Sequence, residues 1–216
     1  MILIKKGKEP PSLTRYRKLP DAYYDGCDKA DIRESLLKEQ GYLCAYCMRR
    51  ISLDETRIEH WKPEAELSEN EKLDYSNMLA VCYKNSEGLP KKDQTCDARK
   101  GQQEIVVDPR QEAHIASIGY QKGTGIIFSE NEAIDSDLNE RLNLNCREQS
   151  LPDNRRAVLQ RVIDEMSRRQ KTGNWKATDI AKMIKLFSET DEAGRKKEYA
   201  GIVLWYLTRK HRGAST

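Results

Sequence analysis

The sequence predicts an α+β protein in which a small mixed core is followed by a mostly helical C-terminal lobe. A short β-prone segment, 56–61, and an apolar one, 75–82, lie among loops and helical stretches in the first half. After residue 150, apolar residues recur at helical spacing almost to the C-terminus. The 216 residues fit one generous domain, or a compact core with an appended lobe.

Three regions are expected along the chain. Residues 1–27 contain Pro10, Pro11 and Pro20 and are predicted to form an extended N-terminal arm. Residues 28–110 are expected to form the core that carries the functional site. Residues 111–216 are expected to form a hairpin and the helical lobe.

Local patterns predict the individual elements. In 28–40, Ile32, Leu36 and Leu37 share one helical face, and Gly41 follows as a natural C-cap. The run 114–129 predicts a hairpin that turns at 122–125. Three amphipathic helices are expected around 158–166, 180–187 and 199–207.

The charge is distributed unevenly along the chain. The formal net charge is only +3, but residues 151–216 carry 15 Lys+Arg against 8 Asp+Glu, a balance of +7. A basic lobe of this kind is compatible with binding to a phosphate backbone. The same balance also fits ordinary solvated helix faces.

The sequence shows neither a bilayer-spanning stretch nor the apolar core of a signal peptide at its N-terminus. We therefore expect a cytoplasmic protein. In that compartment, six cysteines favour metal ligands and free thiols over a disulfide framework.

Four of the cysteines have the arrangement of zinc ligands: Cys44, Cys47, Cys82 and Cys96. The first two have the spacing at which both thiolates reach one tetrahedral ion, and a polar insertion separates the second two. Four thiolates leave no open position for substrate, so such a zinc ion is structural. The alternatives are ordinary buried residues or a redox pair, which would normally open a helix in a βαβ pattern absent here. Cys27 and Cys146 are expected to be free thiols.

The candidate catalytic residues lie within the bracket of cysteines or directly beside it. Glu59 and His60 end the predicted strand, Asn77 lies downstream, and Asp97 follows the last cysteine. In phosphodiester hydrolysis a neutral imidazole can take the proton of the attacking water. Carboxylates such as Glu59 and Asp97 suit Mg²⁺ or Mn²⁺, and an amide such as Asn77 can orient the base.

Residues 44–101 resemble the HNH endonuclease family. The resemblance lies in the runs CAYCMRRI, IEHWKPE, DYSNMLAVC and CDARKG. It implies a ββα-metal finger, with His60 as general base, Glu59 as acidic metal ligand and Asn77 as the residue that orients the base. Asp97 stands where the family has a closing His or Asn, and the insertion 83–95 splits the second cysteine pair.

A closer subgroup resembles more of the chain. The form EHWKPE, the run LNLN at 142–145 and WYL at 205–207 are similar to the PtuB-type nucleases of bacterial Septu and retron anti-phage systems. This resemblance implies an ABC-type ATPase partner (PtuA). It also implies association with a retron reverse transcriptase and its RNA–DNA hybrid.

DNA is the default substrate, because hydrolysis of this kind does not require a 2′-hydroxyl, and structured RNA such as tRNA is the alternative. Lys100, Arg99 and Lys62 are candidate contacts to nucleic acid, and His114 and His211 are expected at the surface or in the hairpin. A hypothesis of another class is a non-catalytic, zinc-stabilised module that binds nucleic acid or an ATPase. It explains the cysteines and the C-terminal helices but leaves the four candidate catalytic residues as coincidence.

Overall fold

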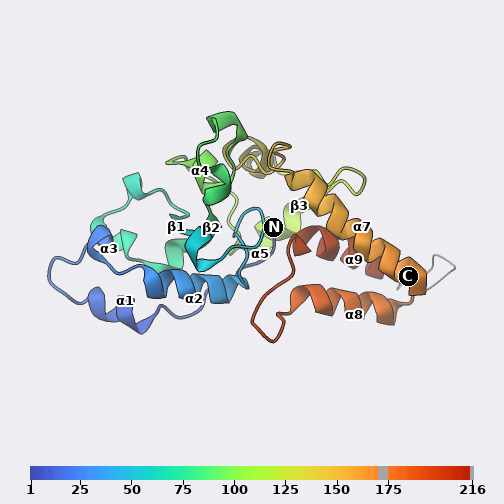
Figure 1. The fold of residues 1–216 in the computed structure, drawn as a ribbon, viewed down its shortest axis with the longest axis horizontal. Coiled ribbons are helices and arrows are strands. Elements are labelled where there is room, and N and C mark those ends of the chain that lie inside the picture. The colour runs from blue at the N-terminus through green and yellow to red at the C-terminus, as the bar shows by residue number, and fades with distance from the viewer. Residues whose placement is uncertain (170–174, 215–216) are drawn as a thin grey trace.

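The structure is a computed structural model that describes residues 1–169 and 175–214. Figure 1 shows an elongated molecule, with the first hairpin and α1–α3 at one end and α7–α9 at the other. The helices are α1 Pro11–Tyr16, α2 Ala30–Gln40, α3 Glu69–Lys72, α4 Cys96–Lys100, α5 Glu112–Ser117, α6 Glu132–Ser136, α7 Leu151–Arg169, α8 Ala177–Ser188 and α9 Ala200–Ala214. The strands are β1 Thr56–His60, β2 Met78–Cys82, β3 Ile118–Tyr120 and β4 Ile127–Ser129. This mixture of helices and strands agrees with the predicted α+β class.

The first hairpin pairs β1 with β2 in antiparallel register, His60 facing Met78 and Glu59 facing Leu79. All five residues of β2 are buried, because α2 and α4 both pack against this strand. Gln40, the last residue of α2, extends the hydrogen bonding of the strand. Its side-chain amide donates to the carbonyl of Ala80 and accepts from the Ala80 N–H, both at 2.8 Å. The end of α2 is therefore fastened to the middle of the hairpin.

Helix α2 ends where the sequence predicts. Gly41 has φ +65°, in the left-handed region that glycine adopts without strain, and its N–H caps the carbonyls of Leu37 and Lys38. The chain turns sharply here and enters the loop of Cys44 and Cys47. The predicted helix over 28–40 and its C-cap are confirmed.

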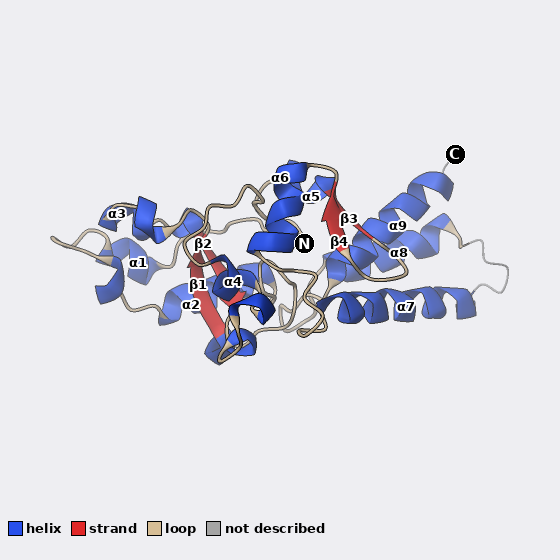
Figure 2. Cartoon of the chain, turned by 90° about the horizontal axis from the view of Figure 1, so that it is seen from above, coloured by secondary structure: helices blue, strands red, loops and turns tan. Residues whose placement is uncertain are grey.

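The second hairpin, β3–β4, and the three C-terminal helices are also confirmed. Helices α8 and α9 pack against each other, and α7 packs against α9 (Figures 1 and 2). Arg155 of α7 is fully buried and donates to the carbonyls of Gly125 and Leu144. These bonds join the lobe to the turn of the second hairpin.

The N-terminal segment differs from the extended arm expected over 1–27. Residues 11–16 form α1, and Met1, Ile4 and Leu13 are buried. The Ile4 N–H donates to the carbonyl of Pro109 at 2.8 Å. Apolar residues among the prolines explain the difference, since their side chains are buried in the hydrophobic core.

In the described ranges, each helix is too short or too polar to cross a membrane.

Candidate metal and catalytic site

The predicted zinc ligands gather into one buried cluster from three elements. Cys44 and Cys47 come from the loop after α2, Cys82 ends β2, and Cys96 begins α4. All four sulfur atoms lie within 4.8 Å of one another, with 3.8 Å between Cys44 and Cys96 and 3.7 Å between Cys47 and Cys82.

These separations fit a single tetrahedral ion. Four sulfurs at about 2.3 Å from zinc in tetrahedral geometry lie about 3.8 Å apart. The prediction that these four cysteines form one metal-binding cluster is therefore supported, and Cys27 and Cys146 lie outside it. The identity of the metal stays a prediction.

The thiols of the cluster are electrostatically coupled. Burial favours the neutral thiol of Cys47, but hydrogen bonds from the three neighbouring thiols lower its pKa well below the usual range. The pKa of Cys82 is raised well above that range by hydrogen bonds with Cys44 and Cys47, and burial raises that of Cys96. The cluster thus favours one thiolate that is hydrogen-bonded by the neighbouring thiols. A bound cation would favour ionisation of these thiols as well.

Glu59 is a buried carboxyl one residue before the end of β1. Its Oε1 lies 2.7 Å from Nζ of Lys100 and accepts from the Tyr46 hydroxyl at 3.2 Å. Burial, and next the charge of Asp97, raise the pKa of Glu59 to about 8 despite the neighbouring Lys100 ammonium. The raised pKa means that the site disfavours two bare carboxylates and favours a proton or a cation between them.

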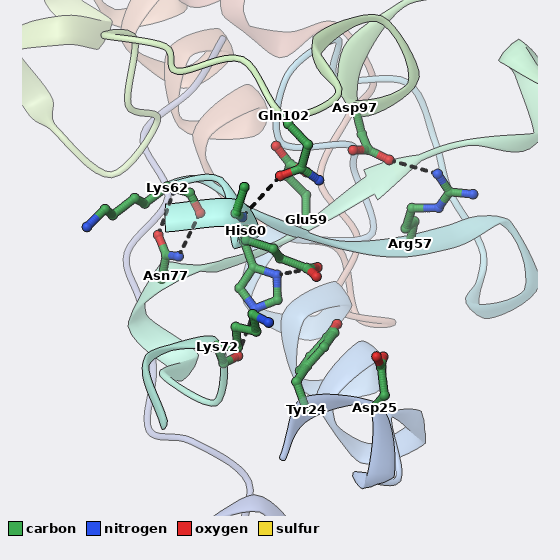
Figure 3. Close-up of polar contacts among 12 residues, drawn as sticks. Tyr24, Asp25, Arg57, Glu59, His60, Lys62, Lys72, Asn77, Asp97 and Gln102 are labelled. Atoms are coloured by element: carbon green, nitrogen blue, oxygen red, sulfur yellow. Dashed lines mark hydrogen bonds and ion pairs between the residues drawn. The ribbon is translucent and has the colours of Figure 1, made fainter. Parts of the chain in front are cut away.

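Asp97, from α4, is the second carboxylate of this pair. Its side chain is 12% exposed and forms an ion pair at 3.2 Å with Arg57 (Figure 3), and its charge acts on the neighbouring Glu59 carboxyl. Two hard oxygen donors that face solvent on one side suit Mg²⁺ or Mn²⁺, because Mg²⁺ keeps several of its waters. The donor set therefore fits the second metal expected from the sequence.

The ring of His60 is held at both nitrogens. Nε2 lies 2.7 Å from the carbonyl of Lys72, and Nδ1 lies 2.9 Å from Oε1 of Glu64. The Lys72 carbonyl can only accept, so Nε2 donates to it, whereas Nδ1 is paired with the Glu64 carboxyl, with which it can exchange a proton. Tyr24 packs edge-on against the ring, 4.7 Å between centroids.

Asn77 contacts the chain just beyond His60. Its Oδ1 accepts from the N–H of Lys62 at 2.9 Å, and its Nδ2 donates to the carbonyl of the same residue at 3.2 Å. The expectation from the sequence is that Asn77 orients the imidazole. In the structure Glu64 and the Lys72 carbonyl hold the ring, whereas Asn77 fixes the backbone that leaves β1, because it lies beside that backbone at the start of β2.

One cavity of about 270 Å³ is lined by Glu59, His60 and Asp97, whereas Asn77 is not among its lining residues. Side chains alternate along a strand, and Figure 3 shows Glu59 with Asp97 on one side of β1 and the His60 ring on the other. Both residues nevertheless line the cavity, which reaches past the end of the strand to Pro63 and Glu64. The carboxyl pair and His60 thus border the same cavity, and the His60 side chain itself is only 1% exposed.

The three cations expected to contact nucleic acid lie in different environments. The Lys100 side chain is 1% exposed, and its ammonium contacts Glu59 and the carbonyl of His60. The guanidinium of Arg99 donates to the carbonyls of Lys91 and Glu140. Of the three, Lys62 is the exposed one. Lys100 therefore organises the site from within, because the buried carboxyl beside it needs a compensating cation.

Several residues of the site had not been anticipated from the sequence. Glu64, Tyr46 and Arg57 contact His60, Glu59 and Asp97 respectively. Glu64 follows His60 by four residues, but outside a helix this spacing does not predict a contact. Tyr46 lies between the first two metal-site cysteines, and no pattern in the sequence connects it to Glu59.

Comparison with known proteins agrees with this geometry at a coarse level. No protein-family model matches the chain. The chain is similar to a candidate HNH endonuclease of retron Vc95 from Vibrio cholerae, at 29% identity over 121 residues. The match covers 50% of this chain and 57% of that relative, so the chain spans little more than half of the relative's length. The similarity supports an HNH nuclease as the class of protein and a retron as its context.

Proposed function

We propose that the chain is an HNH-type endonuclease that hydrolyses phosphodiester bonds with Mg²⁺ or Mn²⁺ in the cavity at the end of β1. The observation that carries the proposal is that one cavity is lined by His60, whose Nδ1 is paired with Glu64, and by the buried carboxyls of Glu59 and Asp97. In this proposal β1, β2 and α4 form the ββα-metal finger. The four cysteines hold a structural Zn²⁺ that ties the loop after α2, the end of β2 and the start of α4 together.

The residues divide the work of hydrolysis among them. Nδ1 of His60 takes the proton of the attacking water after Glu64 releases that nitrogen, while Nε2 donates to the Lys72 carbonyl and keeps the ring in place. Glu64 stabilises the imidazolium that results, because its carboxylate faces Nδ1. A divalent cation held by Glu59 and Asp97 supplies positive charge to the scissile phosphate and the leaving oxygen. Asn77 keeps the backbone beyond His60 in position.

The similarity to the retron protein and the runs EHWKPE and CDARKG support a finer proposal. We infer a PtuB-type role in Septu or retron anti-phage defence, with an ABC-type ATPase that restrains the nuclease until infection. Association with a reverse transcriptase and its RNA–DNA hybrid belongs to the same proposal. DNA is the proposed substrate and structured RNA such as tRNA the alternative.

The test is cleavage of plasmid DNA and total tRNA by the purified protein with Mg²⁺ or Mn²⁺. Removal of the general base is expected to lower the rate by about 10² to 10⁴, so His60→Ala should be nearly inactive while it keeps its zinc and remains folded at the assay temperature. Equal cleavage by His60→Ala and wild type would refute the assignment of the base. Absence of cleavage by the folded, zinc-loaded protein, with and without its genomic neighbours, would favour a non-catalytic binding module.

A further inference from the structure

A second, larger cavity adjoins the catalytic one. It measures about 600 Å³ and lies between the segment 61–63, the segment 104–106 and the helices α6 and Asp137–Arg141. Pro63 lines both cavities. Pro63, three residues after the candidate general base, thus forms the shared wall, so a nucleic-acid strand with its phosphate in the first cavity can place its next nucleotide in the second.

The wall of the second cavity presents an exposed apolar side chain. Val106 is 48% exposed, whereas its neighbours Ile105 and Val107 are 6% and 0% exposed. Pro63 and Ala133 also line this cavity. A solvent-exposed aliphatic side chain beside a polar catalytic cavity contributes little to the stability of the fold, because it is not buried. It does offer a contact surface for a ligand with an apolar face.

The position of Val106 is held by a buried acid. Asp137 is 1% exposed and accepts the backbone N–H groups of Val106 and Val107, the latter at 2.8 Å. It also pairs with Arg141 at 2.9 Å. Both residues belong to a turn of π-helix, Asp137–Arg141, a rare element that is frequent at functional sites. The cavity wall is therefore built to hold its shape before any ligand binds.

The polar groups around the cavity are of mixed kind. Lys62 is exposed at one edge. Nδ1 of His114 accepts from the Asp108 N–H at 3.1 Å, so the other ring nitrogen carries the hydrogen and can donate. Glu104 supplies an acceptor. Arg141 is paired with Asp137, and Glu104 balances Lys62, so no net charge favours a phosphate, whereas a heterocycle with both donors and acceptors matches the set.

We propose that this cavity is a subsite for an unpaired nucleobase next to the scissile phosphate, an inference that rests on the nuclease function proposed above. The volume lies in the range of small-molecule pockets. A base inside a duplex hides its faces in the stack, so only an unpaired base can bring an apolar face to Val106. Lys62, at the edge, is placed for the phosphate that links this nucleotide to the next.

The test is binding of a short, labelled single-stranded oligonucleotide, measured by fluorescence anisotropy without added divalent cation. Val106 offers an aliphatic contact of two methyl groups, worth about 1 to 1.5 kcal/mol or about 5- to 13-fold in affinity, so Val106→Asn is expected to raise Kd about tenfold. Leu186→Asn is the matched control, because Leu186 is also an exposed aliphatic residue, 50% exposed on α8. This variant should bind the oligonucleotide with the Kd of wild type. Ala133→Trp, which fills the cavity from α6, is the second variant and should weaken binding in the same way.

An abasic nucleotide identifies the contact as one with a base. When the abasic nucleotide is placed at successive positions, wild type should bind more weakly at one of them. With the abasic nucleotide at that position, Val106→Asn should not lower the affinity further. Arms with a plain duplex and a duplex carrying one unpaired base distinguish a single-stranded substrate from a base flipped out of a duplex. Equal affinities of Val106→Asn, Ala133→Trp and Leu186→Asn for every oligonucleotide would overturn the subsite.

Failure of the subsite and failure of the nuclease proposal give different results. Binding that depends on Val106, without cleavage under any condition, would contradict the nuclease and support the subsite. Cleavage that requires His60, with binding indifferent to Val106 and Ala133, would support the nuclease and overturn the subsite.

Discussion

Glu59→Gln is expected to stabilise the protein at alkaline pH while it abolishes cleavage. In an unfolded chain the glutamate loses its proton near pH 4.5, whereas in the folded protein its pKa is raised to about 8. Between these values the folded state binds one more proton than the unfolded state, so the free energy of unfolding falls as pH rises. At about 1.4 kcal/mol per pH unit, the loss amounts to about 3 to 5 kcal/mol across the window. Glutamine carries no charge, so the variant does not lose this unfolding free energy as pH rises.

The assay is thermal and urea unfolding at about pH 5 and about pH 8.5, with zinc retained and no other divalent cation. A change of 1 kcal/mol moves the melting temperature of a chain of this size by about 2–4 °C. The melting temperature of the Gln variant minus that of wild type should therefore be larger at the higher pH than at pH 5, by about 6–15 °C. The exposed Glu112→Gln is the control and should behave as wild type.

Mg²⁺ provides a further check on the same site. A cation between Glu59 and Asp97 replaces the proton, so Mg²⁺ should raise the melting temperature of wild type at alkaline pH and leave Glu59→Gln nearly unchanged. A difference between variant and wild type that does not depend on pH would refute the reasoning. So would a variant that loses stability relative to wild type as pH rises.

Two further predictions concern the metal cluster and the second hairpin. Cys47→Ser is expected to lose zinc and about 5 kcal/mol or more of stability, measured by zinc analysis and thermal unfolding. The control Cys27→Ser should keep both its zinc and its stability. One equivalent of zinc retained by the Cys47 variant would contradict the site. Gly125→Ala is expected to cost about 2 kcal/mol or more in urea unfolding, because Gly125 has φ +73° and a Cβ there would lie 2.0 Å from the Pro152 carbonyl oxygen. Gly123→Ala in the same turn meets nothing within 4 Å and should be nearly neutral, so equal losses would show that the turn is not constrained as described.

The sequence predicts those parts of the fold that depend on local patterns. Helix α2 and its cap at Gly41 follow from the spacing of Ile32 and Leu36 and from the conformational freedom of glycine. The hairpin β3–β4 and the three long C-terminal helices follow from periodicity in the same way. The four cysteines could be grouped from spacing, because only a few residue types and separations suit one tetrahedral ion.

The sequence was less informative where contacts are long-range. A lysine near a catalytic motif is typically expected to touch phosphate, but Lys100 is buried against Glu59, 41 residues earlier in the chain. The expectation for Asn77 and the expected N-terminal arm differ from the structure for the same reason. Each depends on which segments come together, and neither periodicity nor spacing reports that.

The sequence alone predicted which residue types the site contains: an imidazole, carboxylates and an amide within or beside four cysteines that could hold a metal. Only the tertiary structure decided how the groups are paired. It places Glu64 and the Lys72 carbonyl on the two nitrogens of His60, and Asp97 beside the buried carboxyl of Glu59. Residue types follow from chemistry that the sequence states directly, whereas protonation and orientation depend on burial and on neighbours that the fold brings from distant parts of the chain.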